Sequence, residues 1–181
     1  MSHLGLPAAI DAKGPYRVCF VCTGNICRSP MAEVVLRHLA ATTPASDGRL
    51  LAEHLAVSSI GTGPWHEGEP MDGRARRALE RAGYVDHGHV ARHLSVDLLA
   101  ETDLLVALDR RHMQTLRSMG RGRVPDDRVV LLRAFDPAGG GPSDVEDPYY
   151  GDVDTFAECL AVVEPACRGL AAALAAHLGR R

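Results

Sequence analysis

Cys22 and Arg28 are separated by five residues, between an apolar run and an apolar-periodic segment. The loop that contains them is therefore expected to join the end of a strand to the start of a helix. Backbone N–H groups and the positive end of the helix dipole bind an oxyanion in such a loop. Arg28 can hold two phosphate oxygens with its planar guanidinium. The same field favours the thiolate of Cys22, which is the reactive form of a cysteine. The spacing predicts a phosphate-binding loop that carries its own nucleophile.

The other residues of this loop suit the same task. A glycine, Gly24, lets the backbone approach an anion closely, and Asn25 tolerates the left-handed backbone that a tight loop can require. Ser29 can cap the following helix, hydrogen-bond the Cys22 thiolate and favour its departure from phosphorus, or do both. The residues expected to bind phosphate with Cys22 and Arg28 are Thr23, Gly24, Asn25, Ile26, Cys27 and Ser29.

Short apolar strands alternate with amphipathic helices along the chain, which predicts an α/β fold with a parallel sheet covered by helices on both faces. In such a sheet the phosphate loop, between strand 1 and helix 1, lies at the carboxyl edge. Residues 1–15 are expected to form a flexible leader, and residues 16–181 a single domain. The predicted strands are 17–21, 54–58, 103–108 and 128–133. The predicted helices are 29–41, 72–83, 109–119 and 153–178, the last bent at Pro165.

Composition excludes several classes of function. The 181 residues carry a formal charge of −3, which gives no basic footprint for nucleic acid. No stretch is expected to reach the roughly 20 apolar residues that span a bilayer, so no membrane partner is predicted. Five cysteines, an odd number without framework spacing, indicate a reducing compartment and a cytoplasmic protein. All but one of the 20 basic side chains are arginine, which is typical of a GC-rich bacterial genome.

Cys19-x2-Cys22 resembles half of a zinc site. Zinc needs about four ligands, and no second pair stands at a suitable spacing. Positions three apart in a strand also point to opposite faces. Cys19 is therefore interpreted as a core residue, and neither a metal nor a cofactor is predicted.

A general acid for a phosphate ester has to come from elsewhere, and the long loop 134–151 offers four carboxylates. They are Asp136, Asp144, Glu146 and Asp147, and two of them precede proline. Residue chemistry alone does not separate these four. Trp65, in a turn-rich segment, and the pair Tyr149 and Tyr150 could form aromatic walls around a substrate ring, or could simply pack.

The chain resembles the low-molecular-weight protein tyrosine phosphatases, of bacterial type, over roughly residues 16–178. Three motifs carry the resemblance most clearly: Cys-Thr-Gly-Asn-Ile-Cys-Arg-Ser-Pro, Ser-Ile-Gly-Thr-Gly-Pro-Trp-His and Asp-Pro-Tyr-Tyr-Gly. The resemblance implies a four-stranded sheet in the order 2-1-3-4. It also implies that Asp147, which precedes Pro-Tyr-Tyr, is the general acid and base, and that Ser59 supports the loop by pairing with Asn25. His89 matches a family position and is assigned a structural role only.

The implied activity is hydrolysis of phosphotyrosine monoesters on proteins through a phosphocysteine intermediate. The expected partners are tyrosine-phosphorylated proteins, and phosphate is expected to be both product and inhibitor. The protein is expected to be a monomer. Arsenate reductase would need further cysteines near the site, and a phosphocarrier lacks the loop arginine. A phosphotyrosine-binding module has no use for an acid. The related protein-arginine phosphatases carry Thr where Ile26 stands.

Cys27 follows Cys22 by five residues in one tight loop. The two sulfurs could therefore come within disulfide range, which requires Cα atoms no more than about 7 Å apart. An accessible thiolate oxidises first to sulfenic acid, which a neighbouring thiol can capture as a disulfide. A redox-sensitive enzyme is expected, as the family resemblance also suggests; the alternative is that Cys27 only fills space beneath the loop.

Overall fold

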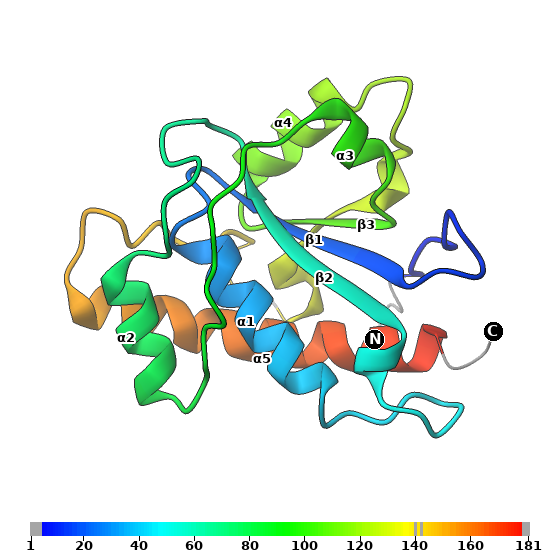
Figure 1. The fold of residues 1–181 in the computed structure, drawn as a ribbon, viewed down its shortest axis with the longest axis horizontal. Helices are drawn as coiled ribbons and strands as arrows, with labels where there is room; N and C mark the ends of the chain where they lie inside the picture. The colour runs from blue at the N-terminus through cyan, green and yellow to red at the C-terminus, as the bar shows by residue number, and fades with distance from the viewer. Residues whose placement is uncertain (1–4, 140, 142, 179–181) are drawn as a thin grey trace.

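The computed structural model describes residues 5–139, 141 and 143–178, and shows an α/β fold around a four-stranded parallel sheet (Figure 1). The strand order is β2-β1-β3-β4, as predicted, and β1 pairs in parallel with both β2 and β3. The phosphate loop follows β1, at the centre of the sheet. The strands are β1 (Tyr16–Cys22), β2 (Leu55–Gly61), β3 (Leu104–Ala107) and β4 (Val129–Leu131).

Helices cover both faces of the sheet. In Figure 1, α1, α2 and α5 lie on one side of the sheet, and α3 and α4 on the other. The described helices are α1 (Arg28–Ala40), α2 (Gly73–Arg81), α3 (Val96–Ala100), α4 (Arg110–Met119) and α5 (Val153–Leu178), with short 3₁₀ helices at Leu51–Glu53, Asp126–Arg128 and Leu132–Phe135.

Successive residues of β1 enter two separate cores, because side chains alternate across a strand. Phe20 and Cys22 pack in the larger core with α1 and α5, whereas Cys19 and Val21 pack in the smaller core beneath α4. Cys19 and Cys22 therefore face opposite sides of the sheet, as predicted. Burial raises the pKa of Cys19 to about 12, which is consistent with a core thiol.

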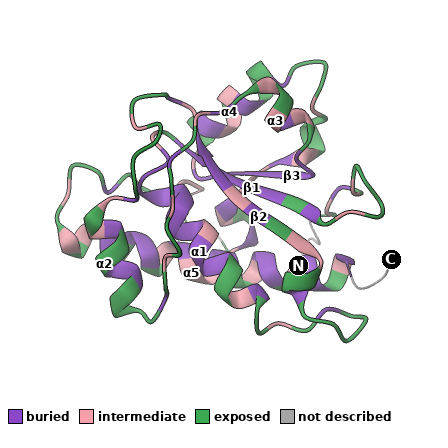
Figure 2. Cartoon of the chain, viewed as in Figure 1, coloured by how far each residue is buried: buried purple, intermediate pink, exposed green. Residues whose placement is uncertain are grey.

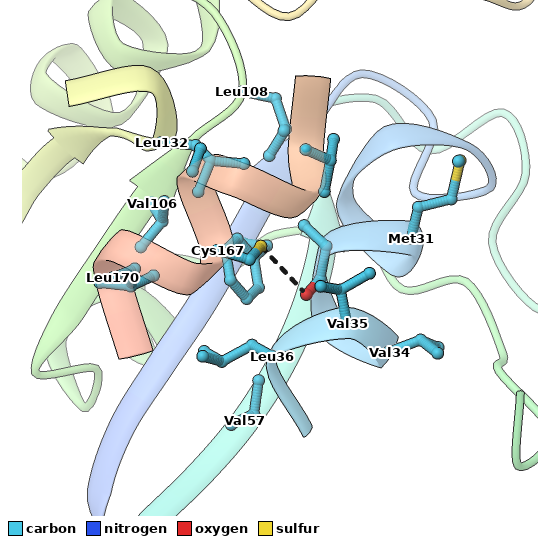
Figure 3. Packing of buried hydrophobic residues seen from close by; sticks show 14 of the residues in the cluster. Met31, Val34, Val35, Leu36, Val57, Val106, Leu108, Leu132, Cys167 and Leu170 are labelled. Carbon is cyan, nitrogen blue, oxygen red and sulfur yellow. Dashed lines mark hydrogen bonds between the residues drawn. The ribbon is translucent and has the colours of Figure 1, made fainter. Parts of the chain in front are cut away.

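The larger core holds the helix that starts at the phosphate loop. Figure 3 shows Val35 and Leu36 of α1 close to Cys167 and Leu170 of α5, and the Cys167 thiol lies 3.7 Å from a carbonyl oxygen of α1. Figure 2 shows the same elements buried on their inner faces and exposed outside. At Gly169 a Cβ would lie 1.8 Å from a backbone oxygen of the 3₁₀ helix Leu132–Phe135, so only glycine allows this approach.

Most element boundaries differ from the predictions by one or two residues, and three differences stand out. β2 continues to Gly61, beyond the predicted end at residue 58, because it pairs with β1 up to Cys22. The predicted strand 128–133 ends at Leu131, and a 3₁₀ helix follows it. Helix α3 was not predicted, although its cap, Ser95, accepts a hydrogen bond from the backbone N–H of Leu98. Tertiary pairing and short caps decide these boundaries more than periodicity does.

Helix α5 contradicts the expectation that no segment could span a bilayer. Its 26 residues are long and apolar enough to do so by length and composition. Half of its most apolar window is buried inside the molecule, where it contacts α1, α2 and the 3₁₀ helix Leu132–Phe135. These are the contacts of a core helix, which passes the same test. The helix continues through Pro165.

The described part of the leader makes specific contacts with the domain. The Tyr16 hydroxyl donates a hydrogen bond to the Pro7 carbonyl at 3.1 Å. Asp103, just before β3, accepts hydrogen bonds from the backbone N–H of Ile10 at 2.6 Å and of Arg17 at 2.7 Å. One carboxylate therefore connects the leader to β1. Flexibility of the leader stays a prediction.

Candidate active site

The backbone of the loop between β1 and α1 turns its carbonyl groups outward. Four loop carbonyls accept hydrogen bonds from surrounding segments, whereas no N–H group of residues 23–27 donates one to a described residue. The N–H groups are therefore available to one anion inside the loop. The outward bonds run from Thr62 N to Cys22 O (2.9 Å), Gly63 N to Thr23 O (2.9 Å), His89 Nε2 to Asn25 O (2.7 Å) and Asp72 N to Ile26 O (2.9 Å).

Two residues make this tight loop possible. Asn25 has φ +56°, the left-handed conformation predicted for it. Gly61, at the end of β2, lies against the loop so closely that a Cβ would be 2.8 Å from the Thr23 carbonyl oxygen. Any other residue at position 61 would push the loop away from the sheet edge.

The Asn25 side chain sets the direction of a hydrogen-bond chain that ends at Cys22. Its Oδ1 accepts from the backbone N–H of Arg92 at 2.8 Å, so Nδ2 is the donor end. Nδ2 donates to Ser29 Oγ at 2.9 Å and to Ser59 Oγ at 2.8 Å. Ser59 then donates to Glu33 Oε2 at 2.6 Å. The pairing of Asn25 with Ser59, which the resemblance implied, is present in the geometry.

Ser29 Oγ lies 2.9 Å from Cys22 Sγ. Ser29 Oγ accepts a hydrogen bond from Asn25, and its own proton has two acceptors within reach, the sulfur and the Ile60 carbonyl oxygen at 3.4 Å. Donation to the sulfur is the shorter of the two contacts. A hydroxyl that donates to a thiolate stabilises the charge on it. Cys22 is only 2% exposed, so it can be reached only through the hollow that the loop surrounds.

The N-terminus of α1 lacks the groups that normally satisfy a helix start. Its cap position, Cys27, makes no side-chain capping bond, and the first turn contains the cation Arg28 and no acidic residue. A cation there opposes the helix dipole, whereas an anion between them would be attracted to both. The helix start is therefore built for a bound anion.

Arg28 is 3% exposed and is held by several oxygens. Its Nη1 donates to Asp109 Oδ2 at 3.0 Å and to the Val145 carbonyl at 3.1 Å. Its Nη2 donates to Asp147 Oδ2 at 2.7 Å. The buried Nε has no hydrogen-bond partner among the described residues. This unsatisfied donor, beside the inward N–H groups, is a further position for an anion oxygen.

Cys22, Arg28 and Asp147 meet in one hollow of about 480 Å³. Asp136 lines a different hollow, where it lies 3.3 Å from Arg133, so the geometry separates the two Asp-Pro pairs. The residues around the catalytic hollow are Cys22, Thr23, Gly24, Ile26, Cys27, Arg28, Trp65, His66, Arg111, Asp147, Tyr149 and Tyr150.

The predicted aromatic residues stand at the mouth of this hollow. Trp65 is 72% exposed and Tyr150 is 96% exposed, which is far from the burial that packing residues have. The rings of Tyr149 and Tyr150 meet edge to face with centroids 5.0 Å apart. Exposed aromatic rings at the rim of a pocket are suited to contact a ligand ring.

Sequence reasoning missed two residues of the site, Asp109 and His112. Asp109 caps α4 directly after β3, so it reaches the same carboxyl edge of the sheet as the loop does. His112 Nε2 lies 2.9 Å from Thr23 Oγ1. The cap position after a central strand was the available signal for Asp109. His89 was expected to have a structural role, and its ring nitrogen contacts the Asn25 carbonyl oxygen and so supports the loop.

All five cysteines are free thiols and all are buried. Burial raises the pKa of Cys27 well above its usual value. Burial therefore favours the neutral thiol of Cys27 over its thiolate.

Known proteins are similar to this chain over nearly its whole length. Residues 17–180 match the sequence model of the family described as low molecular weight phosphotyrosine protein phosphatase. A low molecular weight protein-tyrosine-phosphatase of Streptomyces coelicolor is 49% identical over 161 residues, covering 88% of this chain and 93% of that protein.

Solved structures share the fold. YfkJ from Bacillus subtilis superposes with a TM-score of 0.75 at 33% identity, over 90% of this chain and 96% of that one. A Cys-to-Ser variant of the arginine phosphatase YwlE, a protein of the same bacterium, superposes with a TM-score of 0.70 at 28% identity. The superposition covers 86% of this chain and 93% of that one. The matches to the family model and to the Streptomyces protein span nearly all of the domain. The chain therefore belongs to the low molecular weight phosphotyrosine protein phosphatase family and is a protein-tyrosine phosphatase.

Proposed function

We propose that this enzyme hydrolyses phosphotyrosine monoesters on proteins in two steps, through a phosphocysteine on Cys22. The observation that carries the proposal is the meeting of a nucleophile, a phosphate clamp and an acid in one hollow. The nucleophile is Cys22, the clamp is Arg28 with the inward N–H groups, and the acid is Asp147. No metal is needed, because the clamp carries the charge of the phosphoryl group.

In the first step the Cys22 thiolate attacks phosphorus in line with the tyrosine oxygen. The S–P bond forms as the P–O bond to the ring breaks, and Asp147 delivers its proton to the departing phenolate. The N–H groups of residues 23–27 and the guanidinium of Arg28 stabilise the equatorial oxygens. Asp147 has to leave Arg28 and take up a proton from solvent before it can act as the acid. Phosphoryl oxygens can then take its place on Nη2 and on Nε, which has no partner among the described residues.

In the second step a water molecule attacks the phosphocysteine. Asp147, now a carboxylate, takes the proton of that water as the P–O bond forms and the S–P bond breaks. Inorganic phosphate leaves, and the hydrogen bond from Ser29 stabilises the departing Cys22 thiolate. The YwlE variant with a phosphorylated active-site serine is a precedent for a phosphoryl group carried on the enzyme in a protein of this fold.

Tyrosine is the proposed substrate residue, and arginine the alternative. Trp65 and Tyr149 can flank a flat aromatic ring, while the apolar side chain of Ile26 lines the hollow beside the phosphate site. A branched apolar group offers no hydrogen bond to a guanidinium and crowds it. The free thiols also support a reducing, cytoplasmic setting for the enzyme.

The test compares two substrates without metal. Wild type and Cys22→Ser are assayed in EDTA with one peptide carrying phosphotyrosine and with the same peptide carrying phosphoarginine. The wild type should prefer phosphotyrosine in kcat/KM, and the variant should be inactive on both. A preference for phosphoarginine would overturn the assigned substrate, and a requirement for metal would overturn the mechanism.

A further inference from the structure

We propose that His112 is a positioning residue for phosphate binding, which acts by holding the side chain of Thr23 against Arg28. The inference rests on the proposed function, because it concerns how tightly the same loop holds a phosphoryl group. His112 does not line the catalytic hollow but a neighbouring one, which Thr23 and Arg28 also line. It acts from behind the first residue of the loop.

Direct contacts connect these three residues. His112 is 3% exposed, and its Nε2 lies 2.9 Å from Thr23 Oγ1. Arg28 Nη2 donates to the same Oγ1 at 3.3 Å. Thr23 as a whole is exposed, so burial does not hold its side chain in one rotamer. The hydrogen bonds to His112 and Arg28 have to do so.

The second nitrogen of His112 defines the direction of these bonds. Nδ1 lies 3.0 Å from Asp109 Oδ1, out of line for a hydrogen bond, and has no other partner among the described residues. A carboxylate at that distance favours the proton on Nδ1, which leaves a lone pair on Nε2. Thr23 therefore donates its proton to His112 and keeps its own lone pairs for Arg28.

Asp109 completes a closed ring of polar contacts. Its Oδ2 accepts from Arg28 Nη1 at 3.0 Å, and its Oδ1 also accepts from the backbone N–H of His112 at 2.8 Å. Asp109 thus fixes Nη1 of Arg28, and Thr23 fixes Nη2. Both Asp109 and Thr23 contact His112. The position of the Arg28 Nε edge is thereby fixed, and Nε has no hydrogen-bond partner among the described residues.

A neutral imidazole is required for this arrangement. Burial lowers the pKa of His112 and so does the Arg28 guanidinium, while Asp109 acts in the opposite direction. A charged imidazole would carry a proton on Nε2 and would compete with Arg28 for the Thr23 oxygen. The neutral form is therefore the one that supports the clamp near neutral pH.

The test uses inorganic phosphate as the probe and measures its dissociation constant by calorimetry. His112→Leu should bind phosphate roughly tenfold more weakly, because Thr23 then loses the acceptor that orients it. His112→Gln places a carbonyl oxygen near the former Nε2 and should restore most of the affinity. Thr23→Val should lose as much as His112→Leu, and the double variant should lose no more than either.

Turnover gives a second readout. The kcat/KM of His112→Leu should fall by the same factor on p-nitrophenyl phosphate and on phenyl phosphate, because phosphate binding and not proton delivery is affected. Unchanged phosphate affinity in His112→Leu, no rescue by Gln, or additive losses with Thr23→Val would each overturn the proposal.

The wild type supplies a measurement that needs no variant. ¹⁵N shifts of the His112 ring should identify a neutral imidazole with its proton on Nδ1, and a proton on Nε2 would overturn the proposal even if His112→Leu does not fold. Failure of the proposed function would instead appear as absent turnover in the wild type with phosphate binding and the ring shifts intact.

Discussion

Arg28 Nη2 and Asp147 Oδ2 lie 2.7 Å apart, so the proposed phosphate clamp and the proposed general acid neutralise each other in the free site. Asp147 is about half exposed while Arg28 is buried, which means that the pair can open toward solvent. In the proposed mechanism, substrate binding and release of the acid are the same event, because phosphoryl oxygens would replace the carboxylate on Arg28.

Removing the Asp147 carboxylate should therefore tighten the binding of inorganic phosphate. Ion pairs that are partly exposed contribute up to about 1 kcal/mol, so the dissociation constant of Asp147→Ala should fall by a factor of about two to five. Calorimetry on wild type, Asp147→Ala and the control Asp136→Ala measures this. Weaker phosphate binding in Asp147→Ala alone would mean that the carboxylate does not compete for Arg28.

The same variant should separate substrates by their leaving groups. Asp147→Ala should lose most of its kcat on phenyl phosphate, whose phenolate needs a proton, and much less on p-nitrophenyl phosphate, whose phenolate leaves unassisted. Asp136→Ala should behave as wild type on both, since Asp136 lines another hollow. If the two variants exchange these behaviours, the general acid has been assigned to the wrong Asp-Pro pair.

Local chemistry predicted the part of the site that is local in the chain. The loop, the left-handed Asn25 and the alternation of strands and helices were predicted from the residues themselves, because glycine, asparagine and periodicity leave direct traces in sequence. The strand order was predicted from the family resemblance. The choice of Asp147 over Asp136 needed the family resemblance, since both precede proline. Asp109 and His112 were missed because they reach Arg28 and Thr23 from more than 80 residues away along the chain. The cap position after β3 was the one local signal for Asp109, and no local pattern marked the contact of His112 with Thr23.

Replacing Ile26 by Thr should shift selectivity from phosphotyrosine toward phosphoarginine. Ile26 is buried in the loop and lines the catalytic hollow, where a smaller residue with a hydroxyl would give a guanidinium more room and a hydrogen-bond partner. The ratio of kcat/KM for matched phosphotyrosine and phosphoarginine peptides, in wild type and variant, measures this shift. An unchanged ratio would assign the choice to Trp65 and Tyr149 instead.

Cys27 should protect the enzyme against irreversible oxidation. Peroxide converts an accessible thiolate to sulfenic acid, and the sulfur of Cys27 can then displace water from Cys22 to form a disulfide. Wild type should recover its activity after dithiothreitol, whereas Cys27→Ser should be active at first but recover poorly because Cys22 proceeds to sulfinic acid. Activity recovery and peptide mass spectrometry follow both proteins. Equal recovery would exclude a protective role for Cys27.

Direct detection of the phosphoenzyme tests the central claim, which is covalent catalysis by Cys22. Asp147→Ala should accumulate the intermediate on p-nitrophenyl phosphate, because release of p-nitrophenolate needs little help while hydrolysis of the phosphocysteine lacks its base. Rapid acid quenching followed by peptide mass spectrometry should find one phosphoryl group, on Cys22, and none in the double variant that also carries Cys22→Ser. Turnover without a phosphoryl group on Cys22, or with one on another residue, would contradict the account.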